Sequence, residues 1–318
     1  MSEPPPPPPD RRSRLGGLLR AAFAVIGVAF MVVAFLRTWD RSQGLALPSG
    51  PLAAGAVALV VADLVVALFA WSALLRPAGT GAGERAGGPR ALAPGFFLAQ
   101  LGKYVPGAVW QAVSQIGYAT RAQVGVGRAS VSFVVFAVTQ AAAGGVLGAA
   151  TALLAPGLPG LLRLAAACAA LLAVLLDRRW LVRVVRLAQR RRPGLDAEAL
   201  VADQGAIMRS FALSLGVMAL AGTAFALVLA GTAPDVGVLP AAVPVFALAW
   251  TVGFLALPFP AGLGVREAVL LAALSGAATP AAVIAASVVM RLVFIAAEAL
   301  CILATRVGPL RGPGRPTG

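Results

Sequence analysis

The 318-residue sequence contains no histidine and few charged residues, which make up only 12% of it. Without histidine, catalysis by an imidazole and metal binding by histidine are excluded, and we expect neither a metal site nor a cofactor. Only two cysteines are present, Cys168 and Cys301, and both lie in apolar runs far apart. This spacing predicts two buried thiols and no disulfide. The sequence also lacks a G-x-x-x-x-G-K-[ST] motif, so it offers no P-loop for ATP hydrolysis.

Apolar residues are abundant instead. They make up 59% of the sequence, and the mean hydropathy is +0.88. A soluble domain is nearer half apolar and a quarter charged, so an ordinary soluble enzyme is excluded. One membrane helix needs about 20 apolar residues, which leaves room for roughly eight such helices. The sequence therefore predicts an all-α, polytopic integral membrane protein.

The apolar runs predict where the chain crosses the membrane. A Pro/Arg-rich tail is expected at 1–14, a transmembrane domain at 15–306 and a flexible tail at 307–318. The first run is too long for a signal-peptide core and no cleavage site follows it, so we expect it to stay in the mature protein. Within the domain, eight crossings are predicted, the seventh by a short helix, at 15–36, 51–75, 129–155, 158–176, 207–233, 238–257, 264–278 and 281–305.

A further apolar segment, 91–120, differs from these because it is interrupted. It begins apolar, breaks at Gly102, Lys103 and Pro106–Gly107, and then resumes with polar residues among the apolar ones. Neither half is long enough to span a bilayer. Such a break is tolerated only inside protein or beside a water-filled cavity, so the segment is predicted to form a re-entrant helical hairpin.

The net charge of +14 is distributed unevenly, because basic residues cluster at the ends of the apolar runs. Many lie in a loop at about 177–206, where they alternate with apolar residues as in a basic amphipathic helix. Eight crossings place this loop and both termini on the same, more basic side, which the positive-inside rule assigns to the cytoplasm. We therefore expect a multi-pass protein of the inner (plasma) membrane that contacts anionic lipids and no nucleic acid.

Charged residues inside predicted spans are costly and are therefore candidates for function. They are Asp63, Lys103, Arg266, Glu267, Arg291 and Glu298. Glu267 and Arg291 lie equally far from a predicted turn at Thr279–Pro280, so an antiparallel helical pair puts them at the same depth. The spacing predicts an ion pair, which either only locks the hairpin or lines a polar cavity where Arg291 also meets a lipid phosphate.

Two of the intramembrane carboxyls leave several interpretations open. Asp63 lies in the middle of its span, where it either pairs with a basic residue, relays protons or makes an interhelical hydrogen bond to a small polar residue. Glu298 lies nearer the cytoplasmic end of the last span, where snorkelling to the membrane surface satisfies it.

Two helix starts predict a site for an anion. Tyr104 and Pro106–Gly107 precede one half-helix, and Gly262 and Gly264 precede another. Proline suits the first helical turn, glycine permits close approach of a ligand, and the free N–H groups of a helix start attract anions. Broken segments at matching places in two halves are typical of transporter binding sites. The candidate substrate site also includes Lys103, Arg266, Glu267, Arg291 and Trp110, the last because it lies in the interrupted segment.

Two stretches resemble the signatures of a known family. GKYVPGAVWQ (102–111) and PFPAGLGVREAVLLAALSG (258–276) are similar to motifs of the lysylphosphatidylglycerol synthase transmembrane family, also called flippase-like domain proteins. The resemblance extends over about 15–306 and implies eight spans with re-entrant segments. It also implies that Arg266, Glu267 and, in the next span, Arg291 lie in a lipid pathway. Ala261 departs from the pattern, because many members have glycine there.

Well-understood members of that family fuse this unit to a cytosolic aminoacyltransferase domain and move lysylphosphatidylglycerol across the membrane, and others accompany polyprenyl-linked sugar pathways. No aminoacyltransferase domain follows in this sequence, so we expect no enzyme activity and no catalytic residue. The resemblance implies a flippase for a phosphate-bearing lipid, either an aminoacyl-phospholipid or a polyprenyl-linked one. The alternative is a membrane transferase or a non-catalytic membrane partner in lipid-linked glycan or lysylphosphatidylglycerol metabolism. A separately encoded transferase is an expected partner.

Overall fold

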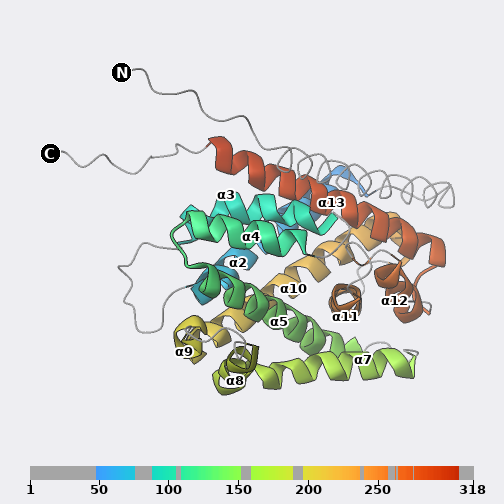
Figure 1. Cartoon of the computed structure of the whole chain (residues 1–318). Coiled ribbons are helices and arrows are strands. Elements are labelled where there is room, and N and C mark those ends of the chain that lie inside the picture. The colour runs from blue at the N-terminus through green and yellow to red at the C-terminus, as the bar shows by residue number, and fades with distance from the viewer. Residues whose placement is uncertain are drawn as a thin grey trace, which may run out of the picture.

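The computed structural model describes residues 48–75, 88–104, 109–151, 159–188, 196–236, 240–256, 262, 264–274 and 276–307. All regular elements among these residues are helices, in agreement with the predicted all-α class (Figure 1). The predicted N-terminal tail and the predicted first span lie outside the described residues, as does all of the predicted C-terminal tail except Val307.

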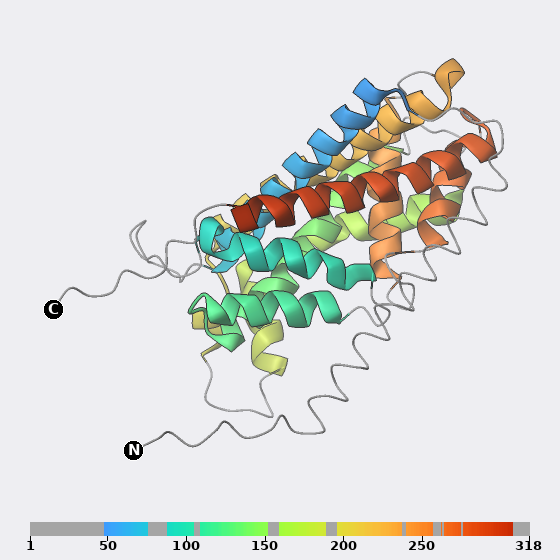
Figure 2. The same ribbon diagram turned by 90° about the horizontal axis from the view of Figure 1, so that it is seen from above.

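Four helices in the described part of the chain are long and apolar enough to cross a membrane, as expected for a membrane-embedded protein. They are α2 (Gly50–Leu75), α5 (Val126–Ala149), α10 (Gln204–Thr232) and α13 (Pro280–Val307). Each coincides with a predicted crossing. Three of them, α2, α10 and α13, run alongside one another, and α2 and α10 share the most extensive interface between described helices (Figure 2).

Three of the predicted crossings correspond to shorter helices. The shorter elements are α7 (Gly160–Leu171), its continuation η2 (Leu172–Leu176), α11 (Ala242–Leu255), α12 (Val265–Leu274) and the 3-10 turn η4 (Pro234–Val236) that follows α10. The 14 residues of α11 extend over about 21 Å, which is less than the roughly 30 Å of a hydrocarbon core. The count of eight crossings therefore stays a prediction.

The interrupted segment 91–120 folds as two short helices that lie side by side. Helix α3 (Pro89–Gln100) continues into the 3-10 helix η1 (Leu101–Tyr104), and α4 (Trp110–Arg121) returns beside them, as Figures 1 and 2 both show. Glycine allows this close approach, because a Cβ on Gly102 would lie 2.6 Å from the backbone nitrogen of Gln111. The segment is thus a helical hairpin, and its re-entrant placement in a bilayer stays a prediction.

Small residues bring the core helices together. Gly144 of α5 faces the Thr251 side chain of α11, and a Cβ added to Gly222 of α10 would lie 2.8 Å from the α11 backbone. Aromatic rings fill the neighbouring space, with Phe225 stacked on Phe246 at a centroid distance of 5.2 Å. Such small-residue contacts are typical of membrane helices, because lipid supplies no hydrophobic driving force between helices and close packing must hold them together.

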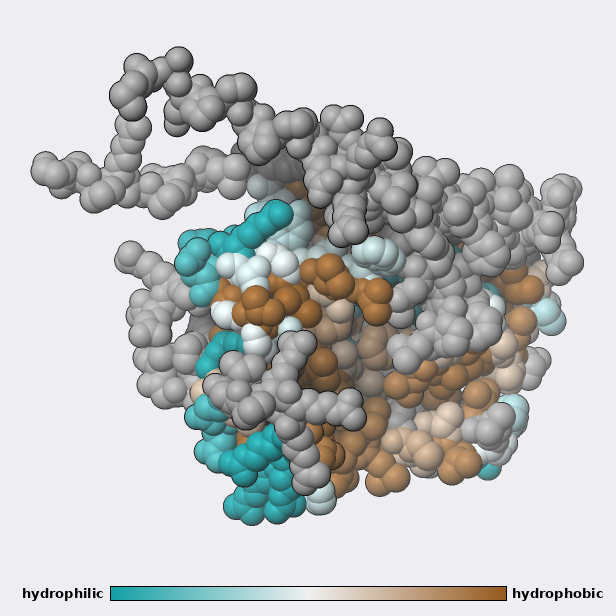
Figure 3. Space-filling view, in the orientation of Figure 1, coloured by the Kyte–Doolittle hydropathy of each residue, from teal (hydrophilic) through white to brown (hydrophobic). Residues whose placement is uncertain are grey.

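The basic loop predicted at about 177–206 contains two helices, α8 (Arg178–Ala188) and α9 (Ala197–Leu200). Arg186 of α8 forms an ion pair with Glu198 of α9, and both side chains are exposed. Only one side chain of α8 is buried. Figure 3 shows hydrophilic residues gathered at the end of the molecule where α8 and α9 lie, and hydrophobic residues over much of the rest of that face. The segment therefore forms a basic, amphipathic cap.

The two cysteines differ in exposure. Cys301 of α13 is buried, as predicted, whereas Cys168 of α7 is exposed, so the prediction is wrong for Cys168. Helix α7 packs against α5 and leaves large apolar side chains such as Leu164 and Leu171 exposed, as expected of a helix whose outer face meets lipid. In an apolar run the residue types do not reveal which face packs on protein, because both faces are apolar.

Candidate functional site

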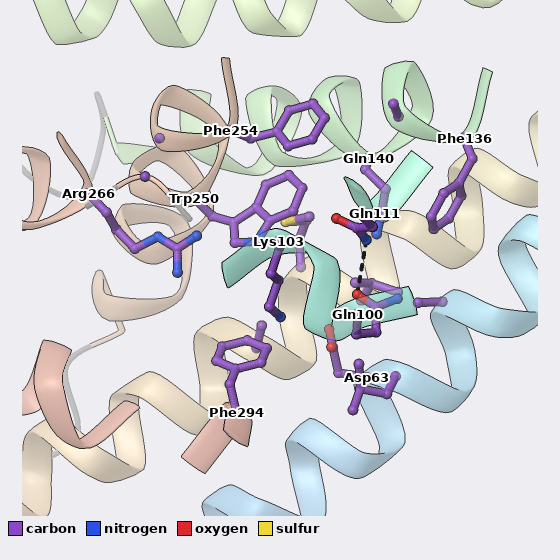
Figure 4. A pocket seen from close by; sticks show the side chains of 18 of the residues that line it. Asp63, Gln100, Lys103, Gln111, Phe136, Gln140, Trp250, Phe254, Arg266 and Phe294 are labelled. Carbon is purple, nitrogen blue, oxygen red and sulfur yellow. Dashed lines mark hydrogen bonds between the residues drawn. The ribbon is translucent and has the colours of Figure 1, made fainter. Parts of the chain in front are cut away.

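A cavity of about 370 Å³ lies among α2, α5, α10, α11, α13 and the α3–α4 hairpin. Its lining is mostly apolar, with aromatic side chains such as Trp250 and Phe294 (Figure 4). The polar side chains in the lining are Asp63, Gln100, Lys103, Tyr104, Gln111, Gln140, Arg266 and Arg291. A mostly apolar cavity with a few convergent polar groups is the usual form of a ligand site.

Five of the residues predicted for the substrate site line this cavity. They are Lys103, Tyr104, Gly262, Arg266 and Arg291. Segments far apart in the sequence supply them, since Lys103 and Tyr104 end the η1 turn, whereas Arg266 begins α12 and Arg291 lies on α13. The structure therefore brings both predicted helix breaks to one place, although Pro106 and Gly107 themselves lie outside the described residues.

The other predicted residues are placed differently. Trp110 is half-buried and does not contribute to the cavity lining described here, whereas Trp250 of α11 does. Gly264 and Glu267 do not belong to the lining. Glu267 is paired with the lining residue Arg291, and the N–H of Gly264 donates a hydrogen bond to Glu267. Trp110 is thus absent from the lining, although its neighbour Gln111 belongs to it, and a role for Trp110 in substrate binding stays a prediction.

One side of the cavity, the arginine end, consists of Arg266, Arg291 and the adjoining Glu267. The predicted ion pair between Glu267 and Arg291 is confirmed. Glu267 Oε1 accepts a hydrogen bond from Arg291 Nε (3.2 Å) and another from the Ser287 hydroxyl (3.0 Å). Both charged side chains are largely but not fully buried, with 13% of Arg291 and 21% of Glu267 exposed.

Arg266 adds a second guanidinium to the arginine end. Its Nε is buried without a hydrogen-bond partner, and no carboxylate among the described residues forms an ion pair with it. Its guanidinium carbon lies 5.8 Å from the centre of the Phe246 ring, which is within the range of a cation–π contact. The arginine end thus has two guanidiniums and one carboxylate, which is paired with Arg291, and it carries an excess of one positive charge.

Two glycines position this end of the cavity. Gly262 has φ +67°, and a Cβ there would lie 2.9 Å from the Cα of Gly253 in α11. Only glycine satisfies both the left-handed backbone and this contact without strain. The close crossing carries the chain past α11 and delivers Arg266 into the cavity at the start of α12.

The start of α12 differs from the prediction in one respect. Gly264 has φ +81°, and its N–H donates to Glu267 Oε2 (2.7 Å). This is the reach-back contact by which a carboxylate in the first turn caps its own helix. The N–H of Gly264 is therefore already occupied, so the prediction that it is free for an anion is wrong. The positive charge at this end comes from the two arginines.

The opposite side, the carboxylate end, consists of Asp63, Lys103 and Glu298. Glu298 is fully buried and forms an ion pair with Lys103. The Lys103 ammonium also lies 4.9 Å from the centre of the Phe294 ring and 5.2 Å from that of Tyr104. The prediction that Glu298 snorkels to the surface is wrong, because the hairpin places a lysine directly beside it.

Asp63 belongs to the same end but lacks an ion-pair partner in the described part of the chain. Its side chain lines the cavity, it is only 5% exposed, and its Oδ1 has no hydrogen-bond partner. Figure 4 shows Arg266 on one side of the cavity and Asp63 on the other, with Lys103 and Trp250 between them. With both carboxyl groups ionised and one ammonium, the carboxylate end would carry an excess of one negative charge.

Glutamines form a neutral polar wall that sequence reasoning did not include. The Gln111 amide of α4 donates to Gln100 Oε1 of α3 (3.1 Å), as the dashed line in Figure 4 shows. Gln140 of α5 lines the cavity as well, and its carbonyl oxygen is buried without a partner. Uncharged polar residues in apolar helices are also costly to bury, so these glutamines were a detectable signal.

Comparison with known proteins places this geometry in a family. A family model described as "Lysylphosphatidylglycerol synthase TM region" matches residues 17–297, which is most of the chain and includes every residue of both charged ends except Glu298. No match was found among curated proteins.

Proposed function

The chain belongs to the lysylphosphatidylglycerol synthase TM region family, and from that premise we propose that it is a flippase that moves a phosphate-bearing lipid across the cytoplasmic membrane. The family supports a lipid-related role in a membrane. The cavity is the basis for two further inferences, that the protein translocates a lipid and that this lipid has a phosphate-bearing headgroup.

The observation that carries this proposal is the unbalanced arginine end. The carboxylate of Glu267 is paired with Arg291, whereas Arg266 has no ion-pair partner among the described residues and its Nε is buried without a hydrogen-bond partner. A buried charge without a counter-charge is strongly unfavourable, so such an arrangement is expected where an anionic ligand completes it. A phosphate suits this position, because guanidinium groups bind phosphate oxygens through short, charge-assisted and often bidentate hydrogen bonds.

The rest of the cavity fits a lipid headgroup and the start of its chains. Its remaining lining is largely apolar and aromatic, with side chains such as Met218, Trp250 and Phe254. An apolar wall tolerates the glycerol backbone or the first isoprene units, while the arginine end holds the phosphate. Either an aminoacyl-phospholipid or a polyprenyl-linked lipid satisfies these requirements.

The proposal also covers the membrane in which the protein lies and the partners it has there. We place the protein in the inner (plasma) membrane with both termini in the cytoplasm and with the cap formed by α8 and α9 against anionic lipid headgroups. The lipid is made by a separately encoded transferase, and this chain itself performs no chemical step.

A reconstituted system tests the proposal. Purified protein is placed in vesicles of phosphatidylethanolamine and phosphatidylglycerol that carry a fluorescent probe, and dithionite bleaches the probe in the outer leaflet. The probes are labelled phosphatidylglycerol and labelled polyprenyl phosphate, with labelled glucosylceramide as the reference without phosphate. We expect the protein to move at least one phosphate-bearing probe faster than the reference.

The Arg266→Gln variant should slow movement of the phosphate-bearing probe by about tenfold or more, because a hydrogen bond to a charged group contributes about 1.5–3 kcal/mol. The matched control is Arg209→Gln, an identical change at an exposed position on α10. Equal rates for wild type and Arg266→Gln would refute the phosphate site. If no probe moves, the alternative of a membrane transferase or a non-catalytic partner takes the place of the flippase.

A further inference from the structure

We propose that Asp63 is a proton-binding site and that the protein moves one proton together with each phosphate-bearing lipid. This inference rests on the proposed function and adds to it the ion that drives transport. It starts from the carboxylate end, which has two buried carboxylates but only one ammonium, and that ammonium is paired with Glu298.

Asp63 lies where an ionised carboxylate needs a counter-charge. It lies in the middle of α2, one of the four helices long enough to span a membrane, and it is 95% buried with Oδ1 unpartnered. A lone carboxylate at that depth is costly, and it is satisfied by a counter-charge or by a proton. Lys103 does not supply the counter-charge alone, because its ammonium is already paired with Glu298.

Among the described residues, the elements packed around Asp63 supply no second positive charge at this end. Helix α13 contributes Glu298 and η1 contributes Lys103, and these are the two charged groups that act on Asp63. The neutral Tyr104 of η1 lines the same cavity. The cavity-lining parts of α5 and α10 carry no charged side chain. The remaining titratable and charged groups around the cavity are Cys301 on α13, and Arg266, Glu267 and Arg291 at the arginine end.

A proton satisfies this site better than a metal ion. Hard cations in proteins need about six or more oxygen ligands, and the carboxylate end offers two carboxylates, one of which is already paired with an ammonium. Among the described residues, no group of three His, Cys, Asp or Glu side chains is placed to hold a metal ion. A proton requires only one carboxylate oxygen: Asp63 takes it up to become the neutral acid and releases it later, with no other bond made or broken.

The two ends couple the proton to the lipid. When a phosphate enters the arginine end, it brings negative charge into the same low-dielectric cavity, which makes a proton on Asp63 more favourable. By reciprocity, a proton on Asp63 favours a phosphate at the arginine end. Because each ligand stabilises the other, the loaded state holds both, and the proton cancels one negative charge of the phosphate as they cross together.

The first test detects the proton without any transport. Infrared spectra of the purified full-length protein are recorded over a range of pH, and the absorption of protonated carboxylic acids is compared with that of the Asp63→Asn variant. Above about pH 6 ordinary carboxyl groups are ionised, so in that range we expect a carboxylic-acid band that titrates in the wild type and is missing in Asp63→Asn. The matched control is Glu198→Gln, the same carboxyl-to-amide change at the exposed α8–α9 cap, which should leave the band intact. A band that persists in Asp63→Asn would overturn the assignment of the proton to Asp63.

The second test measures coupling. In the vesicles described above, a pH difference is imposed across the membrane and the steady-state distribution of the moving phosphate-bearing probe is measured. Co-transport of one proton should enrich the probe in the leaflet on the alkaline side by up to about tenfold for one pH unit. If Asp63→Asn moves the probe, the probe should distribute equally between the two leaflets whatever the pH difference. Glu198→Gln should behave like the wild type.

Each outcome decides one of the two proposals. A wild type that moves the probe without response to pH, enriches it on the acidic side, or responds instead to a sodium gradient overturns proton co-transport and leaves the flippase standing. A wild type that moves no phosphate-bearing probe overturns the flippase and coupling together, and the infrared band then decides only whether Asp63 holds a proton. The wild-type response needs no variant, so poor folding of Asp63→Asn does not block the test.

Discussion

Glu267 of α12 and Arg291 of α13 form an ion pair across the turn at Thr279–Pro280, at equal distances along the chain from Thr279. The same carboxylate accepts hydrogen bonds from the Ser287 hydroxyl and the N–H of Gly264. Glu267 therefore caps the start of its own helix, anchors the neighbouring helix and orients a guanidinium of the cavity at the same time.

Replacing Glu267 by alanine should destabilise the protein by about 3 kcal/mol, the lower end of the range for breaking a buried pair, because both side chains retain some exposure. Arg291 is then left as a largely buried charge without its partner. The double change Glu267→Ala with Arg291→Ala should recover part of the loss. Denaturant unfolding in detergent measures each variant, and strictly additive losses would show that the two side chains do not interact.

Lys103→Gln should destabilise the protein more strongly than a typical surface change, because it leaves the fully buried Glu298 unpaired beside Asp63. Adding Glu298→Gln to Lys103→Gln should restore much of the stability, since two amides can pair without charge. Thermal unfolding followed by circular dichroism makes this comparison. A double variant no more stable than Lys103→Gln would contradict the view that Lys103 serves chiefly to neutralise Glu298.

The Glu267–Arg291 pair was predictable from the sequence, and the Lys103–Glu298 pair was not. In the first case the two residues flank one turn, and the constant rise of a helix converts equal spacing into equal depth. In the second case the lysine lies in the hairpin and the glutamate in the last helix, with several helices between them in the sequence. Their contact depends on how the hairpin docks against α13, and no local pattern encodes that.

The fold was predictable to a similar extent. Long uninterrupted apolar runs such as 51–75 and 281–305 were located closely, because hydropathy alone fixes a helix that lies in lipid. The extents of α11 and α12 were overestimated, because apolar residues continue through the glycine-containing break between them and hydropathy does not register a change of backbone direction. The sequence also selected Trp110 for the cavity and not Trp250, which lines it, because hydropathy does not distinguish two aromatic residues in apolar segments.

The predicted topology places the α8–α9 cap in the cytoplasm and the turn at Thr279–Pro280 on the opposite side of the membrane. Single cysteines are introduced at Arg179 and Thr279, which are both exposed. A membrane-impermeant maleimide should label the cysteine at 279 in intact cells and the cysteine at 179 in inverted vesicles. The background protein must carry Cys168→Ala, because that native thiol is exposed. Labelling of both positions from the same side would refute the proposed number of crossings.

A series of glycine-to-alanine changes tests how the chain delivers Arg266 into the cavity. Gly262→Ala should cost the most stability, because it combines the left-handed backbone strain of about 1–2 kcal/mol with a clash of its Cβ against Gly253. Gly264→Ala should cost only the backbone strain, since φ is +81° but nothing lies within 4 Å of the added Cβ. Gly276→Ala is the control, with open space and no positive φ. Thermal unfolding should rank the losses in that order. Equal losses at 262 and 264 would mean that the crossing of the two backbones does not constrain the start of α12, and Arg266 would then be positioned by α12 packing alone.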